Sequence, residues 1–159
     1  MKEGTIMIMP TSQEVEQEEK ELQFTKFDND TALQLGYRLV EMAKAKSAPV
    51  TIDITRTRQQ LFHAALPGTA IDNDKWLQRK INTVYNFGTS SLAQQLKMEA
   101  ENRGLDDASL LDKTKYAAAG GAFPVVIKGT GLIGTIAVSG MQSEEDHQLI
   151  VDCLKEFLQ

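Results

Sequence analysis

Apolar residues recur at helical spacing over much of the chain. Ala32, Leu35, Leu39, Met42 and Ala43 form one such stripe behind a helix-start sequence at 28–31, which predicts a helix over 28–46. Similar stripes predict helices from 72 or 73 to 87, from 90 or 91 to about 103, and from 143 to 158. A further helix is predicted from 12 to about 22, where a Thr-Ser pair precedes a run of glutamates.

Short segments with alternating or β-branched residues predict five strands. They are 22–27, 50–54, 60–66, 123–127 and 132–138. The gaps between the second and third, and between the fourth and fifth, are short, so each pair is expected to form an antiparallel hairpin rather than a parallel crossover. The order of elements therefore predicts an α+β domain in which helices pack on an antiparallel sheet.

Length and composition narrow the class of protein. A chain of 159 residues suits one domain, predicted over 1–159 with 1–10 as a flexible arm or an added strand. No apolar run approaches the roughly 20 residues of a membrane span, and the single cysteine, Cys153, excludes an internal disulfide. These features favour a cytoplasmic protein without a membrane partner. The net charge of −5 and the lack of a basic stripe argue against nucleic acid as a partner.

The segment Gly129–Gly134, GTGLIG, matches the dinucleotide-binding pattern G-x-G-x-x-G. That pattern holds a pyrophosphate only where a strand precedes it and a helix follows it. Here the residues that follow, Leu132–Val138, are rich in β-branched side chains, so the glycines are expected to form the turn of a β-hairpin. Neither NAD nor FAD is expected as a cofactor.

Few residue patterns point to catalysis. The sequence has neither an H-E-x-x-H zinc motif nor a G-x-S-x-G nucleophile elbow, so no metal ligand and no catalytic residue is assigned. Cys153 lies on the apolar stripe of the last helix and is expected to be a buried, unreactive thiol. His147, near the start of that helix, is expected to be solvated, and His63 is expected at the edge of the core or at an interface.

The candidate ligand-binding residues are His63, Trp76, Arg79 and Lys80. On the predicted helix from 72 to 87, Trp76, Arg79 and Lys80 share a face that is separate from the core stripe beginning at Leu77. A tryptophan beside two cations is typical of an interface or a ligand pocket. The same pattern is compatible with a tryptophan covered by its own domain beside solvated cations.

Two longer segments resemble a known family. They are residues 61–91, LFHAALPGTAIDNDKWLQRKINTVYNFGTSS, and residues 117–150, AAAGGAFPVVIKGTGLIGTIAVSGMQSEEDHQLI. The second combines a GGAFP strand, a hairpin and an IGTIAVSG strand with an acidic helix start. From about residue 14 to its end, the chain is identified as a member of the GlcG/HbpS-like family of haem-degrading domains, in the branch called uncharacterised protein family 0303.

The resemblance implies a profilin-like layered domain with a five-stranded antiparallel sheet flanked by helices, assembled into symmetric homo-oligomers. It also implies binding of haem or a related tetrapyrrole. The haem ligands of other branches lie in the N-terminal helix, which here contains no histidine, so His63 is the remaining candidate ligand. Two functions stay open. One is binding or degrading haem or another small ligand near His63, Trp76 and Arg79, and the other is a non-catalytic oligomeric scaffold or adaptor for a protein partner.

Overall fold

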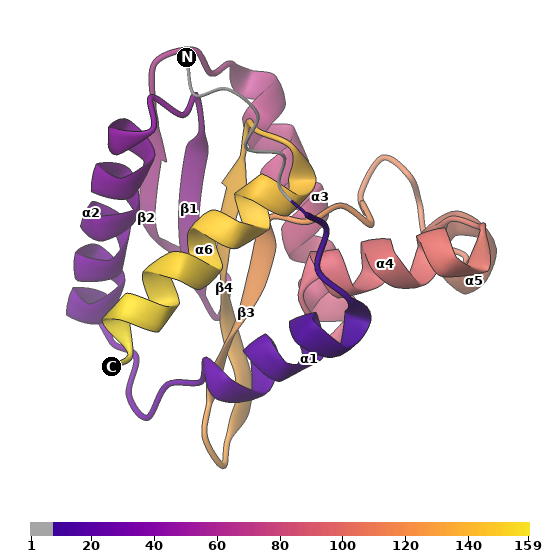
Figure 1. Cartoon of the computed structure of the whole chain (residues 1–159), viewed down its shortest axis with the longest axis horizontal. Coiled ribbons are helices and arrows are strands. Elements are labelled where there is room, and N and C mark those ends of the chain that lie inside the picture. The colour runs from indigo at the N-terminus through magenta and orange to yellow at the C-terminus, as the bar shows by residue number, and fades with distance from the viewer. Residues whose placement is uncertain (1–7) are drawn as a thin grey trace.

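The computed structural model describes residues 8–159, which form six helices and four strands (Figure 1). The helices are α1 (Ser12–Glu21), α2 (Asn29–Ala45), α3 (Ile71–Phe87), α4 (Ser91–Glu101), α5 (Leu105–Ser109) and α6 (Ser143–Phe157). The strands are β1 (Thr51–Arg56), β2 (Gln59–Ala65), β3 (Ala122–Ile127) and β4 (Gly131–Ser139). The predicted α+β class is confirmed. The predicted arm or added strand at 1–10 lies almost wholly outside the described residues.

Side-chain caps explain where several helices begin. Thr11 Oγ1 accepts a hydrogen bond from the Glu14 backbone N–H at 3.1 Å, and Asp28 Oδ1 accepts one from Thr31 N–H at 2.8 Å. Such caps satisfy backbone donors that have no partner inside the helix. Helix α3 begins slightly earlier than predicted, because the Asn73 side chain accepts from the Ala70 N–H (2.8 Å) and so lies within the first turn rather than before it.

The sheet is antiparallel, with strand order β2-β1-β4-β3. Strands β1 and β2 form one hairpin, β3 and β4 form another, and β1 pairs with β4 to join them. Gly129 and Gly131 in the second hairpin have φ of 80° and 115°, and the residues after Gly131 continue as β4. The GTGLIG segment is therefore a hairpin turn and the opening of a strand, as predicted.

The prediction of a fifth strand is wrong. Around Phe24 the chain makes one isolated parallel bridge to Ile127, through the Phe24 N–H to Val126 O (2.8 Å) and the Lys128 N–H to Phe24 O (2.9 Å). The alternating apolar residues of this segment serve the core instead, because the Phe24 and Phe27 rings meet edge to face with centroids 4.9 Å apart. The cap of α2 at Asp28 follows at once and leaves no room for a longer ladder.

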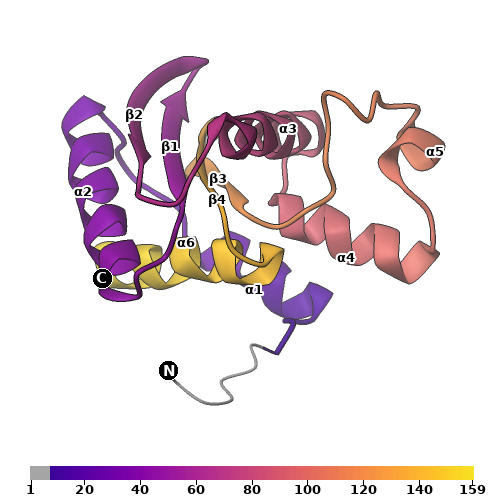
Figure 2. The ribbon, with the colours of Figure 1, turned by 90° about the horizontal axis from the view of Figure 1, so that it is seen from above.

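The sheet separates two layers of helices. Helices α2 and α6 lie on one face and α3 on the other, while α1 packs beside α4 near the start of α6 (Figure 2). The larger core lies on the α2/α6 face and includes Phe24, Leu35, Leu39, Ile52, Ile54, Phe123, Ile136, Leu149 and Leu154. The α3 face is smaller and more polar, since β1 and β4 turn Asp53, Thr55 and Thr135 towards it. Within residues 8–159, no helix is both long and apolar enough to cross a bilayer.

Candidate functional site

A pocket of about 310 Å³ lies between α3 and the start of α6, and we call it the α3–α6 pocket. It opens at the point where β4 ends, since the turn after β4 leads directly into α6. Helix α3 contributes one wall and the turn with the first residues of α6 contributes the other. The residues that line the pocket include Asp72, Asn73, Trp76 and Lys80 from α3, and Ser139, Gly140, Met141, Ser143 and Asp146 from the opposite side.

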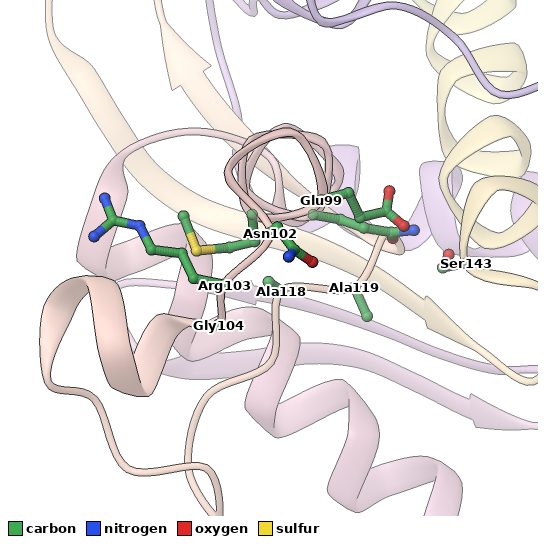
Figure 3. Close-up of a pocket in the computed structure, with 9 residues that line it drawn as sticks. Glu99, Asn102, Arg103, Gly104, Ala118, Ala119 and Ser143 are labelled. Carbon is green, nitrogen blue, oxygen red and sulfur yellow. The ribbon is translucent and has the colours of Figure 1, made fainter.

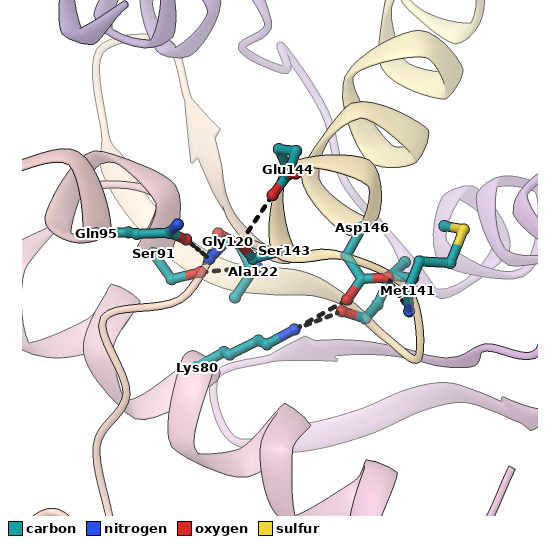
Figure 4. A network of polar contacts seen from close by, with 10 residues as sticks. Lys80, Ser91, Gln95, Gly120, Ala122, Met141, Ser143, Glu144 and Asp146 are labelled. Carbon is teal, nitrogen blue, oxygen red and sulfur yellow. Dashed lines mark hydrogen bonds and ion pairs between the residues drawn. The ribbon is translucent and has the colours of Figure 1, made fainter. Parts of the chain in front are cut away.

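A buried ion pair lies at the floor of this pocket. The Lys80 side chain runs from α3 towards α6, and its Nζ is 3.1 Å from Asp146 Oδ2 (Figure 4). Nζ also donates to the Val138 carbonyl oxygen at 3.2 Å. The other carboxylate oxygen, Asp146 Oδ1, accepts from the Met141 N–H at 3.0 Å. The two side chains are only 4% and 1% exposed, so solvent screens their interaction very little.

Burial moves the proton affinities of the two groups towards each other. Desolvation raises the pKa of Asp146 from its ordinary value to about 6, although Lys80 opposes the shift. Desolvation also lowers the pKa of Lys80, against the attraction of Asp146. The pair is therefore able to exchange a proton at a smaller free-energy cost than an exposed lysine and aspartate.

Gly121, from the GGAFP segment that carries part of the family resemblance, lies against this ion pair. Gly121 has φ of 129°, and a Cβ atom there would lie 2.6 Å from Lys80 Nζ and 2.5 Å from the Val138 carbonyl oxygen. Only glycine combines that backbone conformation with that close approach. The segment is fixed from α4, where Gln95 Oε1 accepts from the Gly120 N–H at 2.8 Å and Ser91 Oγ accepts from the Ala122 N–H at 3.0 Å (Figure 4).

A second, wider hollow of about 550 Å³ adjoins the pocket. It lies along the end of α4, where Glu99, Asn102 and Arg103 reach its rim (Figure 3). Ala119 and Ser143 line both hollows, so the two are adjacent.

The structure brings only some of the predicted site residues together. Trp76 and Lys80 both line the α3–α6 pocket, and the Arg79 guanidinium stacks over the Trp76 ring at 4.3 Å from its centroid. Trp76 remains 38% exposed. The lining does not include His63, whose Nε2 lies 2.6 Å from Asp74 Oδ1 at the other side of α3's first turns.

Burial of two polar side chains goes beyond or against the sequence expectations. Lys80 is not part of the apolar cluster of Leu77, Ile81 and Val84, but it is buried, and Asp146 and the Val138 carbonyl accept hydrogen bonds from its ammonium. His147 was expected to be solvated, but it is fully buried and its Nε2 lies 2.8 Å from Glu18 Oε1. For both side chains the partner comes from a distant part of the chain, 66 residues away for Lys80 and 129 for His147.

Sequence reasoning also missed Asp146, which looked like an ordinary acidic residue at a helix start. Its signal is the segment before it: a strand that ends in Ser139-Gly140 and turns directly into an acidic helix. The expectation for Cys153 is confirmed, since the thiol is buried and its pKa is raised by desolvation to about 12. Within residues 8–159, no cluster of three or more histidine, cysteine or carboxylate side chains could hold a metal ion.

Comparison with known proteins places the chain in a family. The family model described as haem degrading protein HbpS-like matches residues 27–155. The chain belongs to the HbpS-like family. This HbpS-like chain is 46% identical to UPF0303 protein SCO2848 of Streptomyces coelicolor. The alignment spans 155 residues and covers 98% of each chain. The resemblance inferred from the two sequence segments is thereby confirmed.

Solved structures of similar fold extend the comparison. The crystal structure of Ybr137w protein matches with a TM-score of 0.85 and 30% identity, over 93% of this HbpS-like chain and 90% of that one. A complex of PduOC with haem matches with a TM-score of 0.64 and 19% identity, over 78% of this chain and 89% of that one. At 19% identity, the likeness to the PduOC complex shows a shared fold and nothing more.

Proposed function

We propose that the chain binds a compact, polar organic ligand in the α3–α6 pocket, where Lys80 and Asp146 recognise it and Trp76 forms an apolar wall. The observation that carries this function is the ion pair, whose two charges are almost excluded from solvent and still line a cavity. A buried ion pair is weak evidence for stability, because desolvation of both charges offsets their attraction. Titratable groups with perturbed pKa values in a cleft are typical of functional sites.

Haem is named in the family description and in the PduOC complex, but the residues of this pocket do not fit it. A cavity of about 310 Å³ lies near the lower end of the roughly 300–1,000 Å³ range of ligand pockets, which suits a small molecule better than a macrocycle. Among the described residues, the pocket lining includes neither histidine: His63 contacts Asp74, and His147 contacts Glu18. A small ligand is therefore favoured over haem.

The fluorescence of Trp76 tests the proposal directly, because it is the only tryptophan of the chain. The protein is titrated with a panel of short-chain hydroxy acids, hydroxyaldehydes and amino acids, and in parallel with haemin. We expect at least one short-chain compound to change Trp76 emission and raise the Tm. Both effects should be lost in Lys80→Met and kept in His63→Ala. A haemin Soret shift that is lost in His63→Ala and kept in Lys80→Met would contradict the proposal and move the ligand to β2.

A second candidate function is a scaffold or adaptor role, and the exposed face of α3 favours it. Ile71 is 75% exposed at the start of α3, and Arg79 stacks on the exposed Trp76 one to two turns later. Aromatic and arginine side chains of this kind are enriched at protein interfaces. A homo-oligomer is the simplest occupant of this face.

Light scattering after size exclusion tests that role. A solution mass that is a multiple of 17.6 kDa in the wild type, and that falls in the Ile71→Ser/Trp76→Ser double variant, would support it. Lys75→Ser, at an exposed position of the same helix, is the matched control. A mass of 17.6 kDa for the wild type at working concentration would contradict the predicted homo-oligomer.

A further inference from the structure

The Lys80 amine is set up for more than charge recognition. It is a primary amine with two acceptors, the Asp146 carboxylate and the Val138 carbonyl, and it lines the floor of the α3–α6 pocket. The backbone at residue 121 comes so close to the amine that only glycine fits, since a Cβ at Gly121 would lie 2.6 Å from Lys80 Nζ. A solely structural lysine needs neither a cavity above it nor a glycine beside it.

An amine in these surroundings has the properties of a nucleophile. Removal from water disfavours the ammonium form, as the lowered pKa of Lys80 indicates. The adjacent carboxyl group, 3.1 Å from Nζ, can accept the proton that leaves the ammonium. Buried lysines of this kind act as general bases and form Schiff bases with carbonyl substrates.

The remaining charges of the pocket limit the kind of carbonyl compound. Lys80 and Asp146 neutralise each other, and Asp72 at the mouth adds a negative charge. A substrate with several carboxylates or phosphates would therefore be repelled. The hydroxyl of Ser139 and the amide of Asn73 can hydrogen-bond neutral hydroxyl groups, and the ring of Trp76 can cover a short carbon chain.

We propose that Lys80 forms an imine with a small, neutral hydroxyaldehyde or hydroxyketone in the α3–α6 pocket, and that Asp146 carries the protons of the reaction. This inference rests on the ligand-binding function proposed above and names the class of ligand.

The steps balance within the pair. The ammonium of Lys80 first gives a proton to the Asp146 carboxylate, and the free amine attacks the carbonyl carbon. As the C–N bond forms and the C=O π bond breaks, the carbonyl oxygen takes the proton from Asp146. The nitrogen of the resulting carbinolamine returns a proton to Asp146. That proton then leaves with the hydroxyl group as water, while the nitrogen lone pair forms the C=N bond of a protonated imine beside the Asp146 carboxylate.

Reductive trapping tests the proposal. The full chain is incubated at neutral pH with glycolaldehyde and cyanoborohydride, and the modified lysines are located by peptide mass spectrometry. We expect Lys80 to be labelled more than about tenfold faster than the exposed Lys75, because burial disfavours the ammonium form of Lys80 and Asp146 lies 3.1 Å away to accept its proton. Asp146→Asn should slow labelling of Lys80 by about 100-fold, which is the lower end of general acid–base catalysis. It should leave Lys75 unchanged.

The outcomes separate this inference from the proposed function. Equal labelling of Lys80 and Lys75, or a rate at Lys80 that is unchanged in Asp146→Asn, would overturn the imine. If the panel compounds still change Trp76 fluorescence in a Lys80-dependent manner, the ligand-binding function stands without it. If glycolaldehyde does not label Lys80 and no panel compound alters Trp76 fluorescence, the imine and the ligand-binding function both fail. The labelling ratio is measured within the wild-type chain, so it does not depend on a Lys80 variant that folds.

Discussion

At the scale of single residues, the main feature of the site is a charged pair that is almost wholly buried and still lines a pocket. Lys80 belongs to a helix that is otherwise simply amphipathic, and Asp146 belongs to an acidic helix start. Negative charge near a helix N-terminus is favourable by itself, so Asp146 needs no partner there. Asp146 is shielded from solvent because Lys80 of α3 packs against it, and this burial raises the pKa of Asp146.

The raised pKa of Asp146 predicts a specific dependence of stability on pH. The native state binds a proton at Asp146 up to about pH 6, whereas the unfolded chain releases it near pH 3.8. The stabilisation is therefore complete below about pH 4 and is lost as the pH rises through about 6. Relative to Asp146→Asn, the free energy of unfolding of the wild type should fall by up to about 3 kcal/mol over this range, at about 1.4 kcal/mol per pH unit.

Urea unfolding of the wild type and of Asp146→Asn at a series of pH values from about 4 to 7 provides the measurement. Asp152→Asn, which changes an exposed carboxylate on the same helix, is the control and should show no such slope against the wild type. A constant difference between the wild type and Asp146→Asn at every pH would refute the raised pKa.

At the scale of elements, local sequence signals predicted the helices and hairpins well. Thr11, Asp28 and Ser90 mark helix starts by their own capping chemistry, which requires only the next three residues. The glycine-rich segment between β3 and β4 was likewise readable as a hairpin, because β-branched residues follow it. Such features are local, so they need no knowledge of the tertiary structure.

Features that depend on contacts across the chain could not be predicted in the same way. The alternation around Phe24 looked like a strand, although its apolar residues pack into the core and make a single bridge. Periodicity cannot distinguish these outcomes, because both bury alternate side chains. The pocket was also only partly predictable. Trp76 could be identified as a candidate from its residue type and neighbours, whereas the burial of Lys80 depends on a residue 66 positions away.

The attachment of α1 yields a prediction at this scale. Glu18 lies on α1 and its carboxylate is 2.8 Å from the fully buried Nε2 of His147 on α6. Glu18→Ala leaves that ring without its partner, so we expect the free energy of unfolding to fall by about 1–3 kcal/mol. Glu16→Ala, which removes only a surface contact with Lys20, should change it by less than about 1 kcal/mol. Equal losses in the two variants, measured by urea unfolding, would show that the Glu18 contact adds nothing.

At the scale of the whole molecule, the two faces of the sheet are unequally packed. The face towards α2 and α6 carries the large apolar core. On the other face, the apolar side chains Leu77, Ile81 and Val84 of α3 meet mainly Ala122 and Ala137, and the strands add polar groups there. Regions with fewer buried apolar contacts open at lower free energy than the rest of a domain. We therefore expect the layer that holds Trp76 and Lys80 to open at lower free energy than the α2/α6 layer.

Native-state hydrogen exchange should resolve this difference. We expect the amides of α3 to exchange through an opening at least about 2 kcal/mol below global unfolding, since burying a single aliphatic side chain contributes roughly 1.5–3 kcal/mol. The amides of α6 and β1 should exchange only on global unfolding.

Two matched variants test this assignment. Ile150→Val, in the larger core, should lower the exchange free energy of α6 by about 0.5–1.5 kcal/mol and leave that of α3 unchanged. Ile81→Val, its counterpart on α3, should lower the exchange free energy of both helices. If α3 and α6 instead exchange with the same free energy and the same urea dependence, the sheet and both helical layers unfold as a unit. The pocket would then have to admit its ligand without a separate movement of α3.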